Sequence, residues 1–177
     1  RRSLLLAALL QRHLAATAPQ LRPIVVGGTA VEFYTTGGYT TADLDIVLLH
    51  PAEADALLAA SGFVRHGLYW LLPDTDLVVE FHALTLTNAP EAYQRLCEVD
   101  LGDGLTATVI GIEDILFGRL YTAIREHRDN DRRWALDMAT VHAERIDWAV
   151  VADLAVRNGI AAEVADLRAR ILPKARP

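Results

Sequence analysis

Three carboxylates lie at or within apolar stretches of this sequence that are typical of β-strands. Asp43 and Asp45 open the run DLDIVLL, and Glu80 lies inside LVVEFH. Residues i and i+2 of a strand point to the same face, so Asp43 and Asp45 are expected to project together. Two like charges that close repel each other unless a cation lies between them. A hard divalent cation such as Mg²⁺ binds carboxylate oxygens and removes that repulsion.

Glu80 is the candidate for a third carboxylate at the same place. An unpaired charge in an apolar strand costs several kcal/mol, so Glu80 is expected to have a partner. We predict that the carboxyl groups of Asp43, Asp45 and Glu80 converge to roughly 4–7 Å, since ion–oxygen distances are about 2.1 Å. Phosphoryl chemistry often uses two such ions about 4 Å apart. The alternatives are that Asp43 is a turn residue and Glu80 an outward residue of an edge strand. His82 shares the face of Glu80, and its ordinary interpretation is a packed or solvent-facing side chain.

A glycine pair precedes these acids. Gly27 and Gly28 follow the apolar run IVV, at the point where a strand is expected to end and a helix to begin. Glycine lets the backbone approach a ligand closely, and the N–H groups of a helix start favour a phosphate. Thr29 is placed to cap that helix or to bond a phosphate oxygen. A second pair, Gly37-Gly38, is interpreted only as a helix stop and turn.

These residues need a scaffold, and hydrophobic periodicity with turn signals predicts it. In residues 1–60 the predicted elements are a helix at 3–17, a strand at 23–27, a helix at 29–36, a strand at 44–49 and a helix at 51–60. FVRHGLYWLL and DLVVEFHAL are predicted to be two strands joined by the turn at 73–76, and a further strand is predicted at 105–110.

The hydrophobic periodicity of the sequence changes after residue 111, and from there to residue 177 long amphipathic helical patterns follow one another. The fold class is therefore predicted as α/β (α+β), a small α/β core followed by a C-terminal helical bundle. The predicted domains are residues 1–111, the core with its N-terminal helix, and residues 112–177, a helical region packed on that core.

Charge is distributed unevenly along the 177 residues. The net charge is -6, and it arises in residues 1–112, which hold 6 Arg and 12 Asp or Glu, whereas residues 113–177 hold 11 basic and 11 acidic residues. An acidic half argues against broad nucleic-acid binding through that surface and suits a site that gathers divalent cations. Most of the acids are nevertheless expected only to solubilise the surface.

The single cysteine, Cys97, excludes an internal disulfide and a cysteine-based zinc site. No apolar run approaches the roughly 18–20 residues of a membrane span. The N-terminal stretch imitates a signal peptide, but Gln11, Arg12 and His13 interrupt its apolar run, so an amphipathic helix is the preferred interpretation. A cytoplasmic setting and no membrane partner are expected.

The segments VVGGTAVEFY, TTADLDIVL and LVVEFHAL together resemble the nucleotidyltransferases of the DNA polymerase beta superfamily. That family has an apolar strand, a Gly-Gly or Gly-Ser pair, a short helix, Asp-x-Asp on the next strand and a third acid on a later one. The resemblance covers roughly residues 20–140 and is closest to the minimal bacterial members, including abortive-infection type toxins. It implies a mixed sheet and Mg²⁺-dependent (or Mn²⁺-dependent) transfer of a nucleoside monophosphate from a nucleoside triphosphate.

The resemblance also implies roles for individual residues. Asp43, Asp45 and Glu80 would be catalytic and metal-binding, with Glu80 at a position that is usually Asp. The nucleotide-binding residues would be Gly27, Gly28, Thr29 and Arg119, the last at a position that is often Lys.

Several functions remain open. The acceptor hydroxyl could belong to a protein, a tRNA end or a small molecule such as an aminoglycoside, and an antitoxin partner is possible. Many relatives carry Arg where this chain has Tyr39, and with Glu80 this motivates the alternative of a catalytically inactive nucleotide-binding or toxin–antitoxin-type binding module. A metal-dependent phosphohydrolase is a third hypothesis, although it usually needs histidine ligands whose spacing is absent here.

Overall fold

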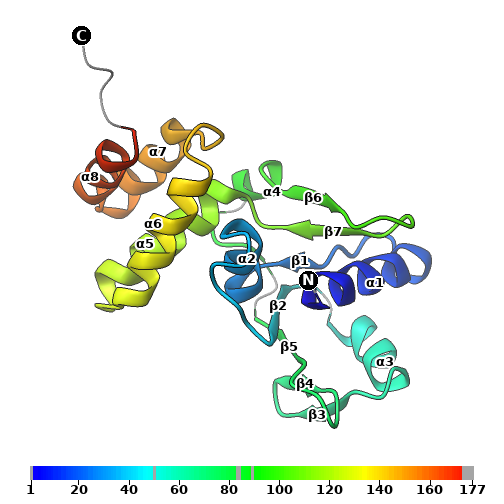
Figure 1. The fold of residues 1–177 in the computed structure, drawn as a ribbon. Helices are drawn as coiled ribbons and strands as arrows, with labels where there is room; N and C mark the ends of the chain where they lie inside the picture. Colours follow the sequence, from blue (N-terminus) through cyan, green and yellow to red (C-terminus); the bar gives the residue numbers. More distant parts are fainter. Residues whose placement is uncertain (1, 50, 83–84, 89, 173–177) are drawn as a thin grey trace. The chain divides into compact units, whose positions relative to one another are not determined.

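The computed structural model describes residues 2–49, 51–82, 85–88 and 90–172. Its contacts divide the chain into two compact units, which we call the sheet unit (residues 1–33 and 40–111) and the helical unit (residues 34–39 and 112–177). The predicted α/β class is confirmed. Figure 1 shows the elements, which are α1 (Arg2–Thr17), β1 (Ile24–Val25), α2 (Gly27–Tyr34), β2 (Asp43–Val47), α3 (Ala52–Ala60), β3 (Val64–His66), β4 (Tyr69–Leu71), β5 (Val78–Phe81), α4 (Glu91–Gln94), β6 (Cys97–Asp100), β7 (Thr106–Val109), α5 (Ile112–Arg125), α6 (Asp129–Val141), α7 (Trp148–Asn158) and α8 (Ala161–Ile171).

The sheet unit is built on one mixed sheet of seven strands in the order β3-β4-β5-β2-β1-β7-β6. Strand β2 pairs in parallel with β5, and β1 pairs in parallel with β7. The remaining neighbours are antiparallel. The parallel pair β2–β5 matters most for function, because it joins the two stretches in which the sequence places its unusual acids.

Alternation of side chains fixes which face of β2 and β5 enters the core. Leu44 and Ile46 of β2 and Val79 of β5 are completely buried. Burying each such side chain stabilises the fold by about 1.5–3 kcal/mol. The acids between them must therefore project from the opposite face, since a strand has a side-chain period of two.

The N-terminal helix α1 packs on the sheet unit through its apolar stripe. Leu10 and Leu14 are buried, and α1 contacts β7, β2 and α3. The side chain of Gln11 accepts hydrogen bonds from the backbone N–H and the hydroxyl of Thr108 on β7, at 3.1 and 2.8 Å. The predicted amphipathic helix is thus part of the core packing. No helix among the described residues has the length and apolar character needed to cross a membrane.

Three local predictions differ from the structure. FVRHGLYWLL is not one strand but the hairpin β3–β4, because Gly67 takes a positive φ of 64° and reverses the chain there. Helix α2 begins at Gly27, two residues before the predicted start. Strand β6 and the single-turn helix α4 have no counterpart in the predictions, since their segment has neither alternation nor helical periodicity long enough to identify.

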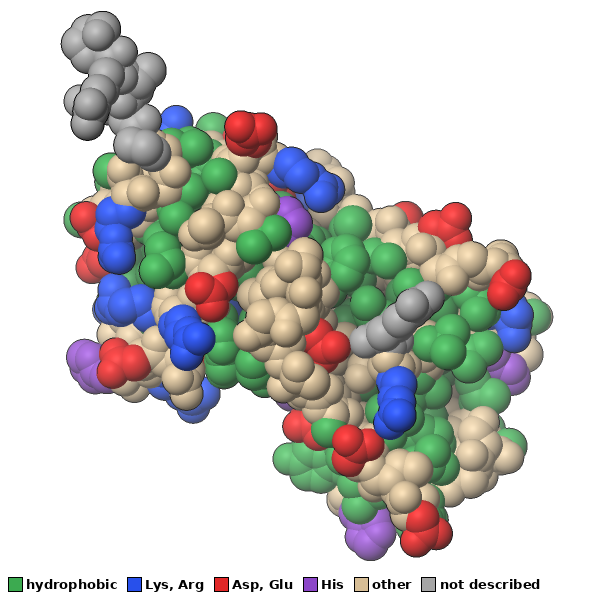
Figure 2. Space-filling model, viewed as in Figure 1, with side chains coloured by type: hydrophobic (Ala, Val, Ile, Leu, Met, Phe, Trp, Pro, Cys, Tyr) green, Lys and Arg blue, Asp and Glu red, His purple; other side chains and the backbone are tan. Residues whose placement is uncertain are grey.

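The helical unit has a core of its own. Helices α5 to α8 enclose buried apolar residues that include Leu116, Trp148 and Leu154. Asp147 caps α7 by accepting from the N–H groups of Ala149 and Val150. On the face drawn in Figure 2, Lys and Arg side chains are more frequent on the helical unit than on the sheet unit, and the sequence likewise has more basic residues in 113–177 than in 1–112.

Candidate functional site

The parallel pairing of β2 and β5 brings two of the predicted acids level with each other. Asp45 is the register partner of Glu80, and Asp43 is the register partner of Val78. Since paired residues of adjacent strands project to the same side, Asp45 and Glu80 stand next to each other on the face opposite the core. The structure therefore gathers Asp45 and Glu80, from segments far apart in the sequence, on one patch of the sheet.

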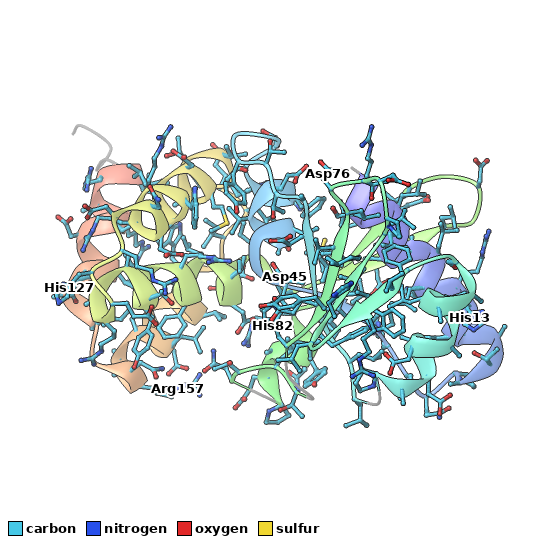
Figure 3. The ribbon with its side chains drawn as sticks, turned by 90° about the horizontal axis from the view of Figure 1, so that it is seen from below. His13, Asp45, Asp76, His82, His127 and Arg157 are labelled. Carbon is cyan, nitrogen blue, oxygen red and sulfur yellow. The ribbon has the colours of Figure 1, made fainter. Side chains whose placement is uncertain are left out.

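His82 completes this group. Its ring Nε2 lies 2.7 Å from Oδ1 of Asp45 and 3.7 Å from Oε2 of Glu80. It follows the last residue of β5, and its backbone N–H still donates to the carbonyl of Ile46, at 3.0 Å. Figure 3 shows the labelled side chains of Asp45 and His82 close to each other. One ligand atom from each of Asp45, Glu80 and His82 lies within 4.8 Å of the other two. We call these three residues the acid–histidine cluster.

The glycine pair holds the Asp45 carboxylate in place. The N–H of Gly28 donates to Oδ2 of Asp45 at 2.6 Å, so this oxygen is bound while Oδ1 faces His82. A Cβ at Gly27 would overlap the Asp45 carboxyl group, and Gly27 also has a positive φ of 54°. Both observations require glycine at position 27. At Gly28 an added Cβ would only approach the side chain of Thr41, at 3.3 Å.

Asp43 and Thr29 are placed differently from the cluster. Asp43 is exposed and is not a member of the group of ligand atoms found among the described residues. Its backbone carbonyl accepts from the hydroxyl of Thr29, at 2.6 Å, and Thr29 is buried. The Thr29 side chain therefore fastens the start of α2 to the start of β2. The predicted convergence of all three carboxylates is seen for Asp45 and Glu80 only.

Arg119, the remaining predicted site residue, belongs to the helical unit. Its Nη1 donates to Oδ1 of the buried Asp131 at 2.9 Å, and its guanidinium lies over the ring of Trp134, 5.5 Å from the centroid. The ring of Tyr39, in the same unit, also lies against Trp134, with 4.6 Å between the ring centroids. Within its own unit Arg119 is thus held by an ion pair and an aromatic ring. Its role in nucleotide binding stays a prediction.

The donor set of the acid–histidine cluster fits a divalent cation. Carboxylate oxygens and an imidazole nitrogen are common metal ligands, and the side chains are partly open, with 13% of Asp45, 23% of Glu80 and 42% of His82 exposed. The sequence interpretation favoured a packed or solvent-facing His82, and the side chain is exposed, but it also contacts Asp45, and the spacing of two residues from Glu80 was the signal for its place in the cluster.

Comparison with known proteins supports the fold. No known family model matches the sequence, and no curated protein matches it. Among solved structures, the chain is similar to an antigenic nucleotidyltransferase-like protein from Paracoccidioides brasiliensis, with a TM-score of 0.56, 14% identity and 94% of each chain covered. The fold is therefore that of nucleotidyltransferase-like proteins.

Two weaker likenesses are to the antibiotic-resistance factor ANT(2'')-Ia. Its solution structure gives a TM-score of 0.44 with 17% identity, covering 92% of this chain and 88% of the other. Its crystal structure in complex with adenylyl-2''-tobramycin gives 0.43 with 20% identity, covering 92% and 94%.

Proposed function

We propose that this chain is a nucleotidyltransferase that moves a nucleoside monophosphate from a nucleoside triphosphate to a hydroxyl acceptor, with a divalent cation such as Mg²⁺ or Mn²⁺. The observation that carries the proposal is the register of β2 and β5, which sets Asp45 beside Glu80 at the start of α2. The nucleotidyltransferase-like fold supports the same reaction class.

The residues of the candidate site have distinct roles in this proposal. Asp45 and Glu80 would hold the cation, which when bound would offset the negative charge of the triphosphate and of the reacting phosphorus centre. The N–H of Gly28 keeps the Asp45 carboxylate in one orientation, so no rearrangement of that side chain is needed on binding. Asp43 shares the outward face of β2 with Asp45, and we propose that it contributes charge to the same cation or triphosphate site.

The test is release of pyrophosphate. The full chain is incubated with each of the four nucleoside triphosphates, Mg²⁺ or Mn²⁺, and in turn a protein extract, tRNA and an aminoglycoside. We expect pyrophosphate together with a nucleotidylated acceptor, and a fall of about 10²- to 10³-fold in both products when Asp45 is replaced by Asn. Asp76→Asn is the matched control, because Asp76 is an exposed acid in the turn before β5, outside the cluster.

Two outcomes contradict the proposal. Inorganic phosphate as the sole product, without a labelled acceptor, identifies a phosphohydrolase. Tight binding of a nucleoside triphosphate without any turnover, in the presence of every acceptor class, identifies a nucleotide-binding module that uses the same fold without catalysis.

A further inference from the structure

The acid–histidine cluster contains a nitrogen ligand, and this bears on which cation it takes. We propose that His82 binds the cation directly through Nε2, so that Asp45, Glu80 and His82 form a mixed nitrogen–oxygen site that prefers Mn²⁺ and the later first-row divalent ions to Mg²⁺. The inference deepens the function proposed above by naming the class of its cation, and its test is binding rather than turnover.

The distances suit a shared ion. Ligand atoms about 2.1 Å from a cation lie about 3 Å apart when adjacent and about 4.2 Å apart when opposite. In the cluster, His82 Nε2 is 2.7 Å from Asp45 Oδ1 and 3.7 Å from Glu80 Oε2, and the three ligand atoms lie within 4.8 Å of one another. Small rotations of partly exposed side chains are enough to place all three around one ion.

The position of His82 is set by the sheet and not by chance contact. Its backbone N–H extends the β2–β5 ladder through the carbonyl of Ile46, and it lies two residues beyond Glu80. The two side chains therefore project to the same side. Asp45 is fixed independently by Gly28, which binds Oδ2 and leaves Oδ1 toward His82. Two of the three donors are thus oriented before any ion binds.

The chemistry of the donors decides the preference. Mg²⁺ favours six oxygen ligands in near-octahedral geometry, whereas imidazole suits first-row transition ions, which bind nitrogen more strongly along the series from Mn²⁺ to Cu²⁺. Ligation through Nε2 needs the lone pair of that nitrogen, so on binding the hydrogen that Nε2 donates to Asp45 Oδ1 is exchanged with solvent and the ring carries its hydrogen on Nδ1 instead. If His82 were only a hydrogen-bond partner of Asp45, the site would be an oxygen site, which accepts Mg²⁺ and Mn²⁺ alike and has no nitrogen ligand to favour the later first-row ions.

The direct test is Mn²⁺ binding to the full chain without nucleotide, followed by electron paramagnetic resonance. Pulsed spectra of the Mn²⁺-bound wild type are expected to show ¹⁴N modulation from the His82 ring, and His82→Gln is expected to abolish it. We expect Mn²⁺ to bind at least about tenfold more tightly than Mg²⁺, and His82→Gln to weaken Mn²⁺ binding by about tenfold or more. His82→Asp, which makes all donors oxygen, should shift the preference toward Mg²⁺.

His66→Gln is the matched control, since His66 is an exposed histidine on β3 outside the cluster, and it should leave binding and modulation unchanged. Absence of ¹⁴N modulation in the wild type, absence of Mn²⁺ binding, or a His82→Gln variant with Mn²⁺ affinity within about twofold of wild type overturns the inference. The wild-type spectrum decides even if a variant fails to fold. Nitrogen ligation without pyrophosphate release would contradict the proposed function alone, and pyrophosphate release without nitrogen ligation would contradict this inference alone.

Discussion

Acidic residues are used in opposite ways in the two units of the chain. In the helical unit, Asp131 is buried and paired with Arg119, and the carboxylate of Glu113 is close to fully buried and accepts the N–H of Asp147, at 3.0 Å. In the sheet unit, Asp45 and Glu80 are partly exposed and stand beside each other, with a histidine as their neighbour.

This contrast separates structural acids from candidate functional ones. A buried carboxylate with a cation or N–H donor directed at it stabilises the packing of its own unit, because its desolvation is offset by those partners. Two carboxylates set side by side repel each other, and the fold maintains this arrangement through the β2–β5 register. Removing Asp131 or Glu113 should therefore damage the stability of the helical unit, whereas removing Asp45 or Glu80 should damage binding or catalysis.

The largest contrast is expected from Asp45→Asn. The amide keeps an oxygen that can accept the N–H of Gly28 but removes the charge, so pyrophosphate release should fall by about 10²- to 10³-fold. Thermal stability should stay the same or rise, since a repulsion with Glu80 is relieved. Melting by circular dichroism checks the second point, and a large drop in melting temperature would place Asp45 with the structural acids.

Gly27→Ala should lose nearly as much activity by a different route. The new Cβ overlaps the Asp45 carboxylate, and the positive φ of Gly27 disfavours alanine by about 1–2 kcal/mol. Mn²⁺ binding and pyrophosphate release should both decrease, together with a measurable fall in stability. Gly28→Ala is the neighbouring control, because its Cβ meets only the Thr41 side chain, and equal losses in both variants would contradict the assigned role of Gly27.

Asp131→Ala should mainly destabilise. It leaves the Arg119 guanidinium without its buried partner, at a cost of about 3 kcal/mol in the free energy of unfolding. Urea denaturation measures this cost, and Mn²⁺ affinity of the acid–histidine cluster should not change. Asp137→Ala on the same helix is the control, since its pair with Arg133 is exposed and contributes about 0.5 kcal/mol or less. Weakened Mn²⁺ binding in folded Asp131→Ala would contradict the distinction between structural acids and candidate functional acids.

Glu113→Ala should give the smallest effect, a loss of about 1–2 kcal/mol, because the N–H of Asp147 at the start of α7 loses its acceptor. Glu113→Gln restores an oxygen acceptor and should recover most of that stability in the same urea titration. A Gln variant as unstable as the Ala variant would show that the charge of Glu113, and not its oxygen, supports the helix start.

Much of the fold was predictable because local signals agreed with tertiary packing. The helical half has long amphipathic periods, and the apolar cores of β2 and β5 alternate with their acids, so the element types and the α/β class followed. The hairpin β3–β4 was missed because FVRHGLYWLL was interpreted as one strand, although Arg65, His66 and Gly67 interrupt its apolar residues where the chain turns. Strand β6 alternates weakly and is recognisable only through its pairing with β7.

The site was predictable only in part, for a reason of register. The spacing of two residues indicated that Asp43 and Asp45 share a face, but not which of them stands level with Glu80. That depends on how β2 aligns with β5, and a shift of two residues would have set Asp43 beside Glu80 instead. The sequence alone also did not predict that Gly27 and Gly28 help to hold Asp45, since this role depends on where α2 begins.

The tip of the hairpin β3–β4 is a candidate position for inserting a tag. It lies in the connection between β2 and β5, and its tip at Gly67 and Leu68 is exposed, with Leu68 69% accessible. Exposed loop tips tolerate insertions, and lengthening a loop adds little entropic cost. Because Tyr69, the residue after Leu68, is the register partner of Glu80, Mn²⁺ binding by a chain that carries a fluorescent tag or affinity peptide at this tip would check that Glu80 keeps its place before capture of an unknown acceptor is attempted.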